Sequence, residues 1–259
     1  IVFITIKVKS DYIYYPLATL IGQIVIAIIS MYLIIGRYKI KIYFPGFKRL
    51  FNTLKKSLNI FVSTVLINLY TTTNFVILGF LASDYDVGVY TSAYKIVIVF
   101  CALIAGTVSQ AIYPNIGYAF AKSYKSGFEK IHITLKIIIP VTLSISIFLF
   151  FFSGIFVKIL FGDKFYEAAL TLKILSFLPL ITSVSNVFWM QGLLNLKKDK
   201  LFTLITAAGA AIGLSLNFML VPLLKYNGTA ISWLFTECFI MALLFFSFVK
   251  SKRTILAKI

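Results

Sequence analysis

The amino-acid sequence predicts an all-α membrane protein, a polytopic helix bundle with about seven transmembrane helices. Hydrophobic residues make up 60% of its 259 residues and charged residues only 13%, proportions outside those of soluble globular domains. The apolar residues gather in long segments, and most charged residues lie in the short connections between them. These observations exclude an ordinary soluble domain.

Each apolar segment can be compared with the length that a bilayer requires. A hydrocarbon core of ~30 Å and a rise of ~1.5 Å per residue require about 20 residues for one helical span. Segments of this length cover residues 12–35, 54–81, 88–112, 133–157, 168–193, 201–223 and 228–249. We expect helices because an open sheet would leave backbone groups unpaired in lipid, and a barrel would show alternating strands of about ten residues.

The basic residues indicate which connections face the cytoplasm. Lys and Arg are concentrated after the first, third and fifth segments and in the C-terminal tail, and such residues favour the cytoplasmic side. The connections SDYDVG, FGDKFYEA and KYNG are short, and the first two contain four of the eight acidic residues, namely Asp84, Asp86, Asp163 and Glu167. We therefore expect these three connections to face outward.

The formal net charge of +17 does not indicate nucleic-acid binding, because the basic residues lie in short connections rather than on a soluble surface. Cys101 and Cys238 lie in apolar segments without metal-ligand spacing. The sequence contains no GxxxxGK loop, HExxH motif or nucleophile elbow. We expect no catalytic residues, no metal site, no cofactor and no enzymatic activity.

Polar residues interrupt the second apolar segment in the stretch LYTTTNFVILG, residues 69–79. The candidate binding residues there are Tyr70, Thr71, Thr73 and Asn74. Polar groups at membrane depth normally face a bundle interior or a watery cavity. Alternatively, the threonine hydroxyls bond to their own helix and Asn74 bridges a neighbouring helix.

Three ionisable residues lie within other apolar segments. Lys95 and Lys173 lie roughly two turns from the outer ends of their segments, where a lysine can bind an anion or extend its ammonium group to the interface. Glu237 lies close to the middle of the last segment, where it would bind a proton, pair with a cation or have a coupling role. Gly209 and Gly213 have the spacing of closely packed helices.

A longer pattern resembles a known family. The stretch LYTTTNFVILGFLASDYDVGVYTSAYKI, followed by SQAIYPNI, resembles Wzx-type polysaccharide flippases of the multidrug/oligosaccharidyl-lipid/polysaccharide exporter superfamily. The pattern is a polar span ending in ILG, a short outer connection, then VG-x-Y-x-x-A-x-K and a closing YP. These positions are Ile77, Leu78, Gly79, Val87, Gly88, Tyr90, Ala93, Lys95, Tyr113 and Pro114. FGDKFYEA, residues 161–168, also resembles a family pattern for an outer connection.

The resemblance implies a twelve-helix transporter made of two six-helix lobes around a central cavity. Residues 1–50 would be the last N-lobe helix and the cytoplasmic inter-lobe linker, and residues 51–259 the six-helix C-lobe. The chain is then expected to be a fragment.

Family membership would also imply a substrate and a location. The expected substrate is an undecaprenyl-pyrophosphate-linked oligosaccharide of O-antigen or a related polysaccharide, flipped from the cytoplasmic to the periplasmic leaflet of the bacterial inner membrane. Lys95 and Lys173 would bind the pyrophosphate, and Tyr70, Thr71, Thr73 and Asn74 the sugar. Glu237 would pair with a lysine or carry a coupling proton. A polysaccharide polymerase and chain-length machinery are the protein partners that this function implies.

Two alternatives remain at this point. A cation-coupled drug exporter of the same superfamily would share the fold, but such a cavity typically relies on acids, whereas this lobe has one acid at membrane depth and several lysines. A membrane glycan polymerase would act on lipid-linked units that are already accessible from outside. The leaflet on which those units accumulate when the protein is lost separates polymerase from flippase.

Overall fold

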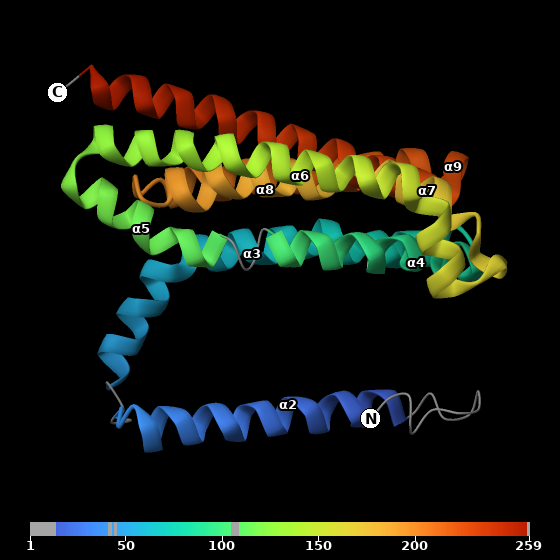
Figure 1. Ribbon diagram of the computed structural model, residues 1–259, viewed down its shortest axis with the longest axis horizontal. Helices are drawn as coiled ribbons and strands as arrows, with labels where there is room; N and C mark the ends of the chain where they lie inside the picture. The colour runs from blue at the N-terminus through green and yellow to red at the C-terminus, as the bar shows by residue number, and fades with distance from the viewer. Residues whose placement is uncertain (1–13, 41–42, 44–45, 105–108, 258–259) are drawn as a thin grey trace. The chain divides into compact units, whose positions relative to one another are not determined.

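The computed structural model describes residues 14–40, 43, 46–104 and 109–257, and the regular structure within these ranges is helical throughout (Figure 1). The sequence prediction of an all-α polytopic membrane protein is confirmed. In chain order the elements are α2 (Tyr14–Tyr32), η2 (Leu33–Arg37), α3 (Phe47–Leu81), α4 (Asp84–Cys101), α5 (Ser109–Lys122), α6 (Tyr124–Phe161), η4 (Asp163–Phe165), α7 (Ala168–Leu175), α8 (Leu178–Asn186), η5 (Val187–Leu193) and α9 (Asp199–Leu256).

The chain forms two compact units, Ile1–Lys55 and Lys56–Ile259. The first contains α2 and η2, which supply one candidate membrane span, Leu20–Arg37. The second contains the helices from most of α3 to α9 and holds the buried core. Within it, α6 packs against α5, α7 and α8, while α4 packs against α7, α8 and α9.

Six described helical segments are long and apolar enough to cross a membrane, and α9 accounts for two of the seven expected spans. Its 58 residues would extend ~87 Å as one straight helix, far beyond a ~30 Å hydrocarbon core. Lys225 interrupts α9 with φ 48° and ψ −128°. A Cβ at Gly213 would lie 2.9 Å from Thr236 Oγ1, and one at Gly209 would lie 2.5 Å from Ile240 Cδ1. Gly209 thus lies against Ile240, and Gly213 against Thr236. Because the residue number rises in the first leg while it falls in the second, α9 is an antiparallel hairpin that turns at Lys225.

Two other expected spans contain more than one labelled helix. The fifth consists of α7, α8 and η5, with Pro179 in the first turn of α8, where a helix does not need the missing N–H. The third corresponds to α4 and the start of α5, and its residues 105–108 lie outside the described part of the chain.

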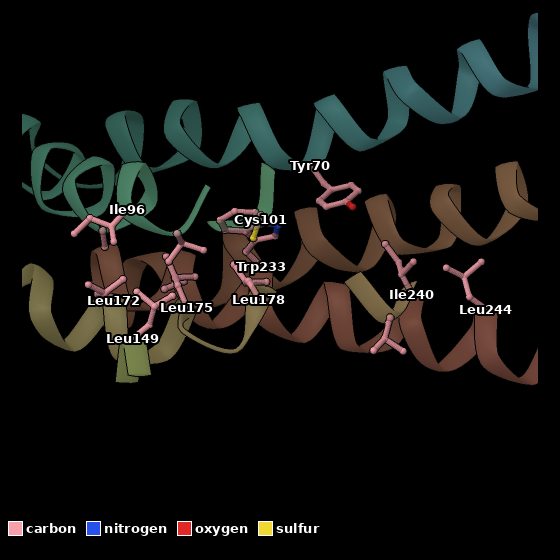
Figure 2. Packing of buried hydrophobic residues seen from close by; sticks show 14 of the residues in the cluster. Tyr70, Ile96, Cys101, Leu149, Leu172, Leu175, Leu178, Trp233, Ile240 and Leu244 are labelled. Carbon is pink, nitrogen blue, oxygen red and sulfur yellow. The ribbon is translucent and has the colours of Figure 1, made fainter. Parts of the chain in front are cut away.

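Buried apolar side chains from α4, α6, α7, α8 and α9 form a common core in the second unit (Figure 2). Ile96, Leu149, Leu172, Leu178 and Ile240 are five of the labelled members of this core. The outside is also apolar, with Phe80, Ile159 and Leu223 each at least 73% exposed. So many exposed large apolar side chains are the surface that a membrane protein presents to lipid.

The three connections expected to face outward contact one another at one end of the second unit. Lys225 Nζ lies 3.9 Å from Asp86 Oδ2, which joins the α9 turn to the start of α4. Tyr226 Oη donates a 2.9 Å hydrogen bond to Glu167 Oε2 in the connection before α7. Asp86 also forms a capping box with Ser83, which fixes the first turn of α4.

The basic connections meet one another through a separate set of contacts. Asn59 Nδ2 of α3 donates a 2.8 Å hydrogen bond to Asp199 Oδ2 at the start of α9. Lys198 Nζ donates a 2.7 Å bond to Ser251 Oγ near the C-terminal end of α9. The connections expected to face outward therefore contact one another, and so do the basic connections, as the alternation of positive residues predicts.

Candidate functional site

Two side chains in the polar stretch of α3 point into the interior of the second unit. Tyr70 is 3% exposed and Asn74 1% exposed, and residues four apart lie on the same face of a helix. Figure 2 shows the Tyr70 ring pointing away from α3 toward α9. These two side chains therefore contact the other helices of the unit rather than its surroundings.

Tyr70 binds the acid near the middle of the last apolar segment. Its hydroxyl donates to Glu237 Oε1 at 2.9 Å, and Trp233 Nε1–H donates to the same oxygen at 3.3 Å. Glu237 is 8% exposed. Among the described residues its carboxyl group accepts from these two neutral donors and forms no ion pair with a lysine. The carboxyl group is held by hydrogen bonds from two separate helical segments.

Glu237 also lines a pocket of about 130 Å³ within the second unit, together with Tyr70, Thr182, Ser185 and Asn186. One water molecule occupies ~30 Å³ in the liquid, so the pocket has room for a few waters or a small hydrated ion. Pockets that hold even drug-sized ligands are typically ~300–1,000 Å³. In this conformation the Glu237 pocket fits a proton or small-cation role and excludes an oligosaccharide.

Asn74 is paired with a second asparagine. Asn217 Nδ2 donates to Asn74 Oδ1 at 2.8 Å and to Gly213 O at 2.9 Å. Within the described part of the chain, Asn74 Nδ2 and Asn217 Oδ1 are buried without a hydrogen-bond partner. The Asn74 carbonyl is thus occupied by a neighbouring helical segment, as in the bridging interpretation of the sequence.

The threonines of α3 differ from one another. Thr71 Oγ1 bonds back to Ile67 O at 2.8 Å, and Thr73 is half-buried. Thr64, Asn68 and Thr72 are exposed and lie at successive intervals of four residues, so they form a polar stripe along one outer face of α3. We refer to these three residues as the α3 polar stripe.

The two candidate lysines lie elsewhere in the second unit. Lys95 is exposed on α4 and lines a pocket of about 250 Å³ with apolar neighbours that include Phe100, Phe156 and Leu160. Lys173 Nζ lies 5.9 Å from the centroid of the Phe150 ring. The pocket at Lys173, about 510 Å³, also contains Lys158, Asp163 and Tyr166. The structure does not bring either lysine into the pocket of Tyr70 and Glu237.

Some site residues were not singled out by the sequence. Trp233 lies one helical turn before Glu237, and this spacing is the signal that could have identified it. Asn217 follows Gly213 by four residues, but nothing local indicated its bond to Asn74. Gln191 Nε2 donates to Ser109 O at 3.0 Å, and Ser109 Oγ bonds to Asn186, which links α5 to α8 and η5.

These features define a polytopic, all-helical membrane protein with a hydrogen-bonded carboxyl group enclosed in a helix bundle. Residues 1–120 match the polysaccharide biosynthesis protein family. A protein of Escherichia coli (strain K12) named "Putative O-antigen transporter" is 30% identical over 251 residues, which is 97% of this chain and 60% of that protein. A protein of the same name from Shigella dysenteriae is 28% identical over 240 residues, covering 92% of this chain and 59% of its own.

A third relative is an uncharacterized membrane protein of Methanocaldococcus jannaschii, 27% identical over 161 residues, with 57% of this chain and 31% of that protein covered. No solved structure matches the chain. The chain spans about 60% of the length of the two O-antigen relatives. Together the matches confirm the resemblance to the polysaccharide biosynthesis family that the sequence pattern indicated.

Proposed function

We propose that the chain is the larger part of a polysaccharide flippase that carries O-antigen or a related glycan across a membrane. The observation that carries this proposal is the 30% identity over 97% of the chain to a relative named as an O-antigen transporter. The polytopic helical fold agrees with it, since six described segments are long and apolar enough to cross a membrane. The proposed activity is transport rather than catalysis.

The finer proposal concerns substrate, direction and location. We propose undecaprenyl-pyrophosphate-linked oligosaccharide as the substrate, moved from the cytoplasmic to the periplasmic leaflet of a bacterial inner membrane. The α3 polar stripe supports a path for sugars, because Asn68 and Thr72 are exposed on a helix of membrane-spanning length. Polar groups are costly in hydrocarbon, so this face suits a watery cavity or another part of the transporter.

The domain proposal follows the same comparison. Residues 1–50 would complete the N-lobe and its linker, and residues 51–259 would form the C-lobe. The relatives are longer than this chain, which leaves room for the other lobe. The polysaccharide polymerase and chain-length machinery are the proposed partners of the complete transporter.

The proposed roles of the polar residues follow from their places in the second unit. Glu237 would couple transport to a proton or small cation, because its pocket of about 130 Å³ admits such a species. Lys95 and Lys173 would attract the pyrophosphate: within the described residues neither forms an ion pair. Tyr70, Thr71, Thr73 and Asn74 would contact sugar only in a conformation where the helices around Tyr70 and Asn74 separate, because both are buried here.

In cells that lack the full-length gene, a Lys95→Gln copy should restore roughly tenfold less surface glycan than the unaltered gene. The reason is that a hydrogen bond to a charged group contributes ~1.5–3 kcal/mol, and ~1.4 kcal/mol corresponds to a tenfold change. Surface glycan is measured by quantitative immunoblotting at matched protein abundance. Lys164→Gln is the matched control, because Lys164 is an exposed lysine of η4, outside the apolar spans. Equal restoration by both variants would remove Lys95 from the substrate path.

A further inference from the structure

A groove of about 520 Å³ lies between the start of α6 and the end of α9. Its lining combines basic, acidic and apolar side chains: Lys125, Phe128, Glu129, His132, Ile133, Lys252 and Leu256. The candidate transport residues discussed above are not among them. We refer to this feature as the α6–α9 groove.

The spacing of the lining residues explains the shape of the groove. Lys125, Glu129 and Ile133 recur every four residues on α6, and Lys252 and Leu256 are four apart on α9. Each set therefore occupies one helical face. The groove is the space where these two faces meet.

Both lysines are available to a bound anion. Lys252 Nζ lies 5.7 Å from the centroid of the Phe128 ring, a cation–π contact that holds the ammonium group at the wall of the groove. Among the described residues, neither Lys125 nor Lys252 forms an ion pair, even with Glu129 in the same groove. With two lysines and one glutamate, the groove carries a net positive charge.

The groove lies at the basic end of the bundle. Lys252 follows Ser251, the residue that binds Lys198 in the connection before α9, and the positive residues assign this end to the cytoplasm. Apolar side chains continue beyond the charged ones, with Ile133 50% and Ile137 61% exposed on α6. A ligand here would have its charged part at the inner headgroup layer and its apolar part in hydrocarbon.

We propose that the α6–α9 groove binds an anionic glycerophospholipid of the inner leaflet. Lys125 and Lys252 hold the phosphate, and the acyl chains lie along Ile133 and Ile137. Basic pockets between membrane helices on the cytoplasmic side are suited to anionic headgroups, and a volume of about 520 Å³ accommodates one. The bound lipid ties the ends of α6 and α9 together, so it stabilises the folded state by mass action.

The experiment uses the full-length protein purified in detergent and titrated with phosphatidylglycerol or phosphatidylcholine. Bound lipid is counted by native mass spectrometry, and the thermal unfolding midpoint is measured in parallel. Phosphatidylglycerol should bind more tightly and raise the midpoint further than phosphatidylcholine. Each of Lys125→Gln and Lys252→Gln should weaken phosphatidylglycerol binding about fivefold, the equivalent of ~1 kcal/mol for each basic residue near an anionic headgroup.

Two further variants distinguish specific binding in the α6–α9 groove from general attraction of anionic lipid to a positively charged surface. Lys130→Gln removes one positive charge from the same turns of α6 at an exposed position outside the groove lining, and it should leave affinity within about twofold. Glu129→Gln removes the negative charge inside the groove and should strengthen phosphatidylglycerol binding by about as much as a lysine loss weakens it.

The same series contains the results that would overturn the proposal. Equal losses for Lys130→Gln and Lys252→Gln would mean that only the surface potential matters. Weaker binding by Glu129→Gln, together with a preference for phosphatidylcholine, would mean that the groove recognises a zwitterionic headgroup. If a lysine variant does not fold, Glu129→Gln still shows whether the groove prefers an anionic or a zwitterionic headgroup, because it strengthens phosphatidylglycerol binding in the first case and weakens it in the second.

Discussion

Replacing Glu237 by glutamine in the full-length protein should reduce transport at least tenfold while leaving most of the protein folded in the membrane. Glutamine keeps the volume of the side chain and a carbonyl oxygen that can accept from Tyr70 Oη, now 2.9 Å from Glu237 Oε1. The group that is lost is the one that can release and bind a proton or hold a cation. Transport is measured as delivery of lipid-linked glycan to the outer leaflet across a range of external pH.

Tyr70→Phe is the matched control for the hydrogen-bond network. It removes one donor to Glu237 but keeps the carboxyl group and the bond from Trp233 Nε1. We expect a loss of about 1–2 kcal/mol in unfolding free energy and a smaller loss of transport than in Glu237→Gln. Wild-type transport by Glu237→Gln at every pH would show that Glu237 is structural and has no coupling role.

Gly228→Ala should cause the largest loss of folded protein among the glycine variants. A Cβ on Gly228 would lie 2.4 Å from Leu220 O and 2.7 Å from Leu220 C. These are backbone atoms of the opposite leg of α9, which cannot rotate away as the end of a side chain can. Forcing atoms into a close-packed region typically costs ~1–3 kcal/mol and occasionally more, and we expect the upper end of that range or beyond. The readouts are abundance in the membrane and the unfolding midpoint of the purified protein.

Gly79→Ala provides the comparison for Gly228→Ala. A Cβ at Gly79 would lie 3.8 Å from Val87 Cγ2, an ordinary van der Waals distance. Alanine is favoured over glycine in helices by ~1 kcal/mol, so this variant should be as stable as the original or slightly more stable. Equal stability of the two variants would contradict the close approach of the two legs of α9 near the Lys225 turn.

The spans could be predicted because length and hydropathy are local properties of the sequence. The turn at Lys225 was predictable because KYNG separates the last two apolar segments. The structure keeps this turn very short, since α9 is helical on both sides of Lys225. The division of the fifth span at Pro179 had a local signal in the proline.

The site was predictable residue by residue but not pair by pair. Polarity at membrane depth identified Tyr70, Asn74 and Glu237, yet Tyr70 and Glu237 are 167 positions apart in the sequence. Their contact depends on how α3 packs against α9, which no local pattern encodes. Likewise, the positions of Lys95 and Lys173 indicate depth along their helices but not the direction of each side chain around the helix axis, so their separate pockets could not be foreseen.

The most direct measurement of the proposed function is the leaflet on which undecaprenyl-linked oligosaccharide accumulates in cells that lack the full-length gene. We expect the lipid-linked units to accumulate on the cytoplasmic side and re-expression of the gene to relieve the accumulation. Surface glycan should recover at the same time. Normal surface glycan in the deleted strain would contradict a flippase and favour drug export. Accumulation of the lipid-linked units on the periplasmic side would also contradict a flippase and would favour polymerisation.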